Sequence, residues 1–171
     1  MLQQTQVKTV IPYYQRFVLK FPDVACLAAA GMEDVLKAWE GLGYYARARN
    51  LYRAARMVCL DHGGCVPDSY AAFRSLPGVG DYIAAAVLSI AFNQPLCVVD
   101  GNVKRVLARL LMIDDPVNAA SARERFQFEA DRLLDRKHPG CFNQAMMELG
   151  ALICRPGNPQ CGECPVKRRC L

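Results

Sequence analysis

Apolar residues recur with the spacing of an α-helix along almost the whole chain. In the first stretch, residues 7–21, they fall at every third or fourth position, which places them on one face of a helix. Seven further stretches are predicted to be helical: 32–39, 44–62, 69–74, 81–92, 102–112, 119–136 and 141–153. Only "LCVVD" (96–100) alternates, weakly, as a strand would. The sequence therefore predicts an all-α protein.

The composition excludes several classes of protein. Lys and Arg number 21 against 16 Asp and Glu, and this net charge of +5 permits a polyanionic partner without requiring one. The longest apolar runs, of about ten residues, are too short to span a bilayer. No signal-peptide pattern opens the sequence. We expect a monomeric intracellular protein with no membrane partner, in the cytoplasm or, in a bacterium, at the nucleoid.

Nine cysteines are many for 171 residues. Their odd number and the absence of a secretion signal argue against a disulfide framework. Five are scattered along the chain, most of them on apolar helix faces, and we expect them to be small buried apolar side chains: Cys26, Cys59, Cys65, Cys97 and Cys141.

The other four cysteines stand within residues 154–170, "CRPGNPQCGECPVKRRC". Cys154, Cys161, Cys164 and Cys170 form a C-x6-C-x2-C-x5-C array, in which Pro and Gly allow sharp turns. A four-cysteine zinc site usually has two C-x2-C pairs, and only one is present here. A single compact loop suits a [4Fe–4S] cluster, whose irons each take one thiolate. Zinc and two local disulfides are the alternatives.

Basic residues crowd the same loop, namely Arg155, Lys167, Arg168 and Arg169. These side chains could balance the negative charge of a thiolate-bound cluster. They could instead face outward toward phosphates. The composition of the loop leaves both interpretations open.

"LPGVG" (76–80) combines a Pro–Gly turn with a second glycine directly before a predicted helix. Gly78 and Gly80 leave the backbone amides at the start of that helix uncovered, and such amides favour anions. A plain helix–helix turn explains the same pattern. Twenty residues after Gly80, Asp100 stands at the start of another predicted helix. It is either an ordinary N-cap residue or a carboxylate that stabilises a developing cation.

Together these motifs resemble the helix–hairpin–helix superfamily of DNA base-excision glycosylases, of the endonuclease III type. "MLQQTQV", "WEGLGYYARARNL", "DGNVKRVLAR" and "FNQAMMELGALIC" are similar to motifs of the adenine DNA glycosylases. The resemblance runs through essentially the whole chain and implies a two-lobed helical fold. A barrel lobe with the hairpin would take 1–102, and a second lobe, ending in the cluster loop 154–170, would take 103–171.

The resemblance also implies a reaction and a partner. The family removes adenine mispaired with 8-oxoguanine or guanine in double-stranded DNA, after the base is extruded into a pocket. Asp100 and Asn102 would stabilise the oxocarbenium-like sugar, with Tyr82 beside them, and Gln144 would line the adenine pocket. The DNA-contacting residues implied by the motifs are Gln3, Gln4, Thr5, Tyr44, Gly78, Val79, Gly80 and Lys104.

Tyr82 bears on the type of reaction. In the bifunctional branch of the superfamily, a lysine at this position attacks the sugar as an amine. A phenol cannot form a Schiff base, so we expect a monofunctional glycosylase. Lys104 is the nearest substitute amine, and we expect it instead to contact phosphate or to pair with a carboxylate.

The start of the chain departs from the family pattern. No N-cap residue precedes the first apolar stripe, so we expect the chain to begin inside a helix. In the family, a glutamate two residues before "MLQQTQ" protonates adenine N7, and this sequence begins after that position. One hypothesis is an adenine DNA glycosylase whose sequence starts late, with very weak excision by the chain as it stands. A non-catalytic iron–sulfur DNA-binding remnant and an endonuclease III-like glycosylase/lyase are the alternatives.

Overall fold

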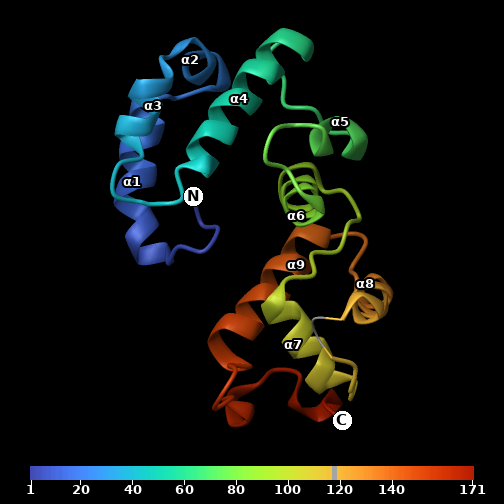
Figure 1. Ribbon diagram of the computed structural model, residues 1–171. Coiled ribbons are helices and arrows are strands. Elements are labelled where there is room, and N and C mark those ends of the chain that lie inside the picture. The colour runs from blue at the N-terminus through green and yellow to red at the C-terminus, as the bar shows by residue number, and fades with distance from the viewer. Residues whose placement is uncertain (117–118) are drawn as a thin grey trace. The chain divides into compact units, whose positions relative to one another are not determined.

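The computed structural model describes residues 1–116 and 119–171, and these residues form helices joined by loops, with no strand. The all-α prediction is therefore confirmed (Figure 1). The described chain divides into two compact units, Met1–Val79 and Gly80–Leu171. The motif-based boundary after residue 102 lies inside the second unit, and the two lobes implied by the resemblance stay a prediction.

The first unit contains five helices in its described residues. They are α1 (Val7–Lys20), α2 (Val24–Ala29), α3 (Met32–Ala38), α4 (Ala46–Asp61) and α5 (Tyr70–Arg74). Helix α4 contacts both α2 and α3, and α1 contacts α3.

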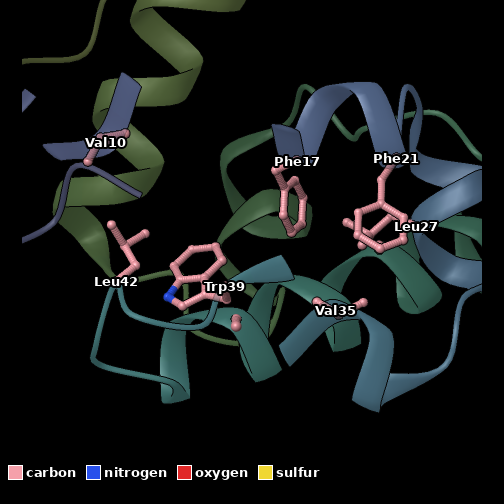
Figure 2. Packing of buried hydrophobic residues seen from close by; sticks show 9 residues of the cluster. Val10, Phe17, Phe21, Leu27, Val35, Trp39 and Leu42 are labelled. Atoms are coloured by element: carbon pink, nitrogen blue, oxygen red, sulfur yellow. The ribbon is translucent and has the colours of Figure 1, made fainter. Parts of the chain in front are cut away.

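The core of the first unit is built from buried side chains of α1 to α4, several of which are seen in Figure 2. Trp39, only 1% exposed, lies edge-on to the Phe17 ring, with the ring centroids 6.0 Å apart. The indole N–H donates to the Gly43 carbonyl over 3.0 Å, so the polar edge of this large side chain is satisfied. Trp39 thereby connects the apolar core to the loop that precedes α4.

The expectation that the chain begins inside a helix is wrong. Helix α1 begins at Val7, with Gln6 as an extended N-cap residue that makes no side-chain cap. The preceding segment is irregular: Thr5 N–H donates to the Leu2 carbonyl, and Gln4 has a φ of +56°. That left-handed conformation is incompatible with a continuing right-handed helix. Tertiary hydrogen bonds to this segment, described below, replace helical ones.

The second unit carries the remaining elements of the described chain. They are α6 (Asp81–Phe92), α7 (Gly101–Leu110), α8 (Ala120–Leu133), α9 (Pro139–Glu148), the π-helical turn η1 (Leu149–Ile153) and the 3₁₀ turns η2 (Cys161–Glu163) and η3 (Lys167–Arg169). Helix α9 contacts α6 and α7, and α7 also contacts α8 and η1. "LCVVD" is a non-helical connector between α6 and α7 rather than a strand.

A buried amide organises the second unit. Asn143, on α9 and 1% exposed, donates to Ser89 Oγ on α6 and to the Leu96 carbonyl, each over 2.8 Å. Its Oδ1 atom accepts the Val98 N–H over 3.1 Å. The connector between α6 and α7 is itself neither a strand nor a helix, so its backbone groups need side-chain partners. Asn143 supplies them and so determines the path of the chain toward Asp100.

The prediction that the five scattered cysteines are buried is wrong for most of them. Only Cys97 is buried, Cys59 is half-buried, and the other three are exposed. Burial raises the pKa of the Cys97 thiol to about 12, with further contributions from Asp131. Cys26 and Cys141 lie at exposed positions of α2 and α9, and Cys65 lies in the loop after α4.

None of the described helices is long and apolar enough to cross a bilayer.

The turn ahead of α6 depends on a glycine. Gly78 has a φ of +79°, and Val79 N–H donates to the Leu76 carbonyl over 3.1 Å. A Cβ atom at Gly78 would lie 2.7 Å from both Cβ and Nδ2 of Asn50 on α4. Arg74 closes the turn by donating to the Val79 carbonyl over 2.7 Å. The turn therefore needs glycine for two separate reasons, its backbone conformation and its closeness to α4.

Replacing Gly78 tests this close approach. Gly64→Ala is the matched control, because Gly64 has a similar φ of +81° with nothing within 4 Å of an added Cβ. Both substitutions should lower the free energy of unfolding by about 1–2 kcal/mol, because alanine disfavours a left-handed backbone conformation. Gly78→Ala should lose about 1–3 kcal/mol more through the contact with Asn50, measured by urea unfolding. Equal losses in the two variants would contradict the role given to the contact.

Candidate functional site

Helix α6 begins with its first-turn amides uncovered by any capping side chain. Gly80 is its extended N-cap residue, and its carbonyl accepts the Ala84 N–H over 2.9 Å. The carboxylate of Asp81, also in the first turn, forms an ion pair with Arg123 at 2.7 Å. The Arg123 guanidinium offsets the negative charge of the Asp81 carboxylate. Asp81 therefore repels an incoming anion less at the start of α6, where the helix dipole and the first-turn amides favour one.

Asp100 is the N-cap residue of α7. Its Oδ1 atom accepts the Val103 N–H over 2.8 Å, as an ordinary capping aspartate does. Its second oxygen accepts from Asn102 Nδ2 over 3.4 Å. The carboxylate is therefore held in one orientation by two donors on its own helix, and the capping role predicted from sequence is real.

Tyr82 lies near this carboxylate. Its phenol donates to Met147 Sδ over 3.7 Å, and 42% of its surface is exposed. Partial burial, and then the negative charge of Asp100, raise the pKa of the Tyr82 phenol. The phenol therefore stays protonated at neutral pH and can donate a hydrogen bond at the site.

A chain of hydrogen bonds leads from Asp100 to the first cysteine of the tail. Asn102 Oδ1 accepts from Arg105 Nη2 over 2.7 Å. Arg105 also donates to the Gly150 carbonyl over 2.7 Å and, through Nε, to the Cys154 carbonyl over 2.8 Å. A Cβ atom at Gly150 would lie 2.6 Å from Asn102 Cβ, so η1 packs directly against α7.

Sequence reasoning missed Arg105 and Asn143. Arg105 follows Asn102 by three residues, a spacing that places both on one helix face and could have indicated the contact. Asn143 stands next to another amide, Gln144, on α9, and its partners come from α6 and the connector. No local pattern predicts such partners.

Two predicted site residues of the second unit, Lys104 and Gln144, have side chains that contact α8 and α9, respectively. The Lys104 ammonium lies 6.0 Å from the centre of the Phe126 ring, on the α8 side of α7. The exposed Gln144 side chain donates to the Gly140 carbonyl of its own helix over 3.2 Å. Their predicted roles toward phosphate and adenine stay predictions.

In the first unit, three predicted DNA-contacting residues contact one guanidinium. Arg47, on the first turn of α4, donates to the Gln3 carbonyl and, over 3.2 Å, to Thr5 Oγ1. Its Cζ atom lies 5.2 Å from the centre of the Tyr44 ring. Gln4 stands between Gln3 and Thr5 in the chain, and its side chain is exposed. Sequence reasoning placed these four residues in one role but missed the arginine that three of them contact.

The four-cysteine tail folds back on the end of α7. Arg109 Nη1 donates to Cys154 Sγ over 3.3 Å, and the Cys170 thiol lies 3.5 Å from the Arg109 carbonyl oxygen. The first and last cysteines of the array therefore contact the same residue. The Leu171 N–H donates to the Leu110 carbonyl over 3.4 Å, which closes the loop. The basic side chains of η3 are exposed, so the structure favours the outward-facing interpretation for them.

The donor set fits a thiolate-bound cluster in chemistry and topology. All four thiols are free, in agreement with the prediction that they form no disulfide. They are not gathered around one point, however: in residues 1–116 and 119–171, no three His, Cys, Asp or Glu side chains are close enough to hold one metal ion. The [4Fe–4S] prediction therefore rests on the residue types and the closed loop.

The chain is similar to known base excision DNA repair proteins. The family model described as "HhH-GPD superfamily base excision DNA repair protein" matches residues 1–128, which include the glycine turn and Asp100. The chain is 44% identical over 170 residues to an adenine DNA glycosylase of Buchnera aphidicola, covering 99% of this chain and 48% of the relative. It is 47% identical over 171 residues to the adenine DNA glycosylase of Homo sapiens, covering 99% and 31%. The chain thus spans about half, or less, of the length of these relatives.

Solved structures with the same fold include a thymine-DNA glycosylase and an endonuclease III–DNA complex. A thermostable thymine-DNA glycosylase superposes with a TM-score of 0.88 at 30% identity, covering 99% of this chain and 78% of that one. A trapped endonuclease III–DNA covalent intermediate superposes with a TM-score of 0.82 at 26% identity, covering 99% and 78%. The family match, the relatives and these structures agree: this chain belongs to the HhH-GPD superfamily of base excision DNA repair proteins.

Proposed function

We propose that this chain is the catalytic core of an adenine DNA glycosylase. Its substrate is double-stranded DNA with adenine opposite 8-oxoguanine or guanine, and the protein acts as a monomer. It hydrolyses the bond between adenine and deoxyribose after the base is flipped out of the duplex. The reaction is monofunctional and leaves the DNA strand intact.

The observation that carries this proposal is the environment of Asp100. Its carboxylate is oriented by Val103 N–H and Asn102 and has a protonated phenol, Tyr82, nearby. A fixed negative charge of this kind stabilises a developing positive charge. No amine stands at the Tyr82 position to attack the sugar, which argues against the lyase alternative.

In the proposed reaction, the bond from C1′ of the sugar to N9 of adenine breaks, and its electron pair leaves with the base. Protonation of adenine at N7 makes the base a better leaving group. The carboxylate of Asp100, with Asn102, stabilises the oxocarbenium-like sugar until water adds to C1′ and loses a proton. The products are free adenine and an abasic site. Gln144 is proposed to contact the adenine in its pocket.

The DNA contacts are proposed to divide between two sets of residues. Gly78, Val79 and Gly80 would bind the backbone of the adenine strand through their main-chain amides, assisted by Lys104. Gln3, Gln4, Thr5 and Tyr44 would enter the duplex and read the oxidised guanine strand. Tyr44 is 61% exposed, which suits an aromatic side chain that stacks on a base.

Cys154, Cys161, Cys164 and Cys170 are proposed to hold a [4Fe–4S] cluster. When bound, the cluster would cross-link the tail and stiffen the loop that presents Lys167, Arg168 and Arg169. Arg109 already contacts the first and last of the four cysteines. An intracellular location follows from this proposal, because the partner is cellular DNA.

Binding to mispaired DNA tests the proposed substrate. The chain should prefer a duplex with 8-oxoguanine opposite a non-hydrolysable adenine analogue over a fully matched duplex, measured by fluorescence anisotropy. Tyr44→Ala should weaken binding to the mispair by about 1–3 kcal/mol through lost stacking. Tyr14→Ala, at a 58% exposed tyrosine of α1, is the control and should bind normally. Equal affinity of the parent chain for both duplexes would contradict the proposal.

A second prediction concerns the acid. Extending the chain so that Glu stands two residues before Met1 should raise adenine excision by about 10²–10⁴-fold over the same extension with Gln, because general-acid catalysis is typically of this size. The readout is single-turnover excision from an 8-oxoguanine:adenine duplex. In the Glu form, Asp100→Asn should reduce excision by about 10²–10³-fold, while Asn keeps the N-cap acceptor. No excision by the Glu form would favour a non-catalytic DNA-binding module.

The cluster has a direct chemical test. The anaerobically purified chain should be brown and contain about four iron and four sulfide per chain. Cys161→Ser should lower the iron content, because it removes one of the four thiolates. Cys141→Ser alters an exposed cysteine outside the loop and should leave iron unchanged. A colourless protein with one zinc per chain would refute the cluster.

A further inference from the structure

The guanidinium of Arg47 joins two irregular segments of the first unit. One is the opening segment, residues 1–5, where Arg47 donates to the carbonyls of Met1 (2.7 Å) and Gln3 and to Thr5 Oγ1. The other is the loop ahead of α4, where it donates to the carbonyls of Gly43 over 3.2 Å and Leu42 over 3.5 Å. Five acceptors from two separate stretches of chain therefore share one side chain.

Each of these segments contains a non-glycine residue in the left-handed region. Gln4 has a φ of +56° and Tyr44 a φ of +49°. Side chains disfavour this conformation, and it persists where surrounding contacts determine it. Both residues are immediate chain neighbours of groups bonded to Arg47, namely Gln3, Thr5 and Gly43. The contacts that hold both conformations therefore converge on the same guanidinium.

The acceptors around Arg47 are all uncharged. They are four main-chain carbonyls and one hydroxyl, and no acidic side chain of the described chain forms an ion pair with this arginine. The guanidinium also lies 5.4 Å from the centre of the Trp39 ring and 5.2 Å from that of Tyr44. A flat, forked donor between two rings satisfies this geometry, whereas a lysine ammonium cannot span the two segments.

We propose that Arg47 is a positioning residue that sets the conformation of residues 1–5 and of Tyr44 together, so that both segments are pre-organised to enter mispaired DNA. This inference rests on the proposed function for its DNA partner. Because these two segments are already ordered before DNA binds, binding loses less conformational entropy. Arg47 itself acts through Gln3, Thr5 and Tyr44, and its own charge is directed inward at carbonyls.

The chain carries its own probe for this arrangement. Trp39 is its only tryptophan. The indole is buried, donates to Gly43, and faces the Arg47 guanidinium. A change in how Arg47 holds the loop should therefore alter Trp39 emission and its quenching by acrylamide, without any DNA present.

The experiment compares Arg47→Lys with Arg49→Lys in the full 171-residue chain. Both substitutions keep the charge, and Arg49 is an exposed residue of the same helix. Arg47→Lys should increase acrylamide quenching of Trp39 and reduce the preference for 8-oxoguanine:adenine over matched duplex by about tenfold. Affinity for matched duplex should stay unchanged, because the net charge is the same. Far-UV circular dichroism and the thermal midpoint establish that both variants fold.

The possible outcomes separate this inference from the proposed function. Parental quenching and parental mispair preference in Arg47→Lys would overturn the positioning role, as would an equal effect of Arg49→Lys. Increased quenching with an unchanged mispair preference would also overturn it, because the loop would then change without consequence for DNA. If the parent chain itself does not distinguish the two duplexes, the proposed function fails, and the DNA half of this inference fails with it. The Trp39 measurement then still decides whether Arg47 organises the two segments.

Discussion

The structure depends on satisfying main-chain groups in loops between short helices. Such loops leave carbonyls and amides without helical partners, and a buried group without a partner is costly. At the candidate sites, three polar side chains form hydrogen bonds with such main-chain groups. Arg47 serves the opening segment and the loop before α4, Asn143 serves the connector after α6, and Arg105 serves η1 and the start of the tail. Each donates to carbonyls that are distant in sequence.

These three side chains also explain why candidate functional residues occupy irregular backbone. Tyr44 and Gln4 stand beside groups bonded to Arg47, and Asp100 ends the connector held by Asn143. Loops can present side chains that a regular helix would direct along its own faces, provided that a scaffold holds them. In this chain the scaffold is a set of short helices, from which Arg47 on α4, Arg105 on α7 and Asn143 on α9 hold the neighbouring loops.

Much of this could be predicted from local pattern. The 3.6-residue period identified the α-helices of the described chain except α2, which is only six residues long, and the predicted bounds are close to those observed. The glycine turn, the N-cap position of Asp100 and the four free thiols of the tail also follow from short motifs. The errors lie where local pattern conflicts with tertiary contact. The opening segment is irregular, with Arg47 donating to its carbonyls, and three of the five scattered cysteines are exposed.

The sequence by itself determined that the chain is all-α, that Asp100 begins a helix twenty residues after a glycine turn, and that position 82 carries a phenol rather than an amine. Those properties depend on residue type and on spacing within one or two helical turns, which the chain carries locally. Only the tertiary structure decided that Gln3, Thr5 and Tyr44 share Arg47, and that Asn102 connects to the tail through Arg105. The contacts from Arg47 to Gln3 and from Arg105 to Cys154 join residues 44 and 49 positions apart. Their partners are main-chain carbonyls, which every residue possesses, so no sequence pattern identifies them.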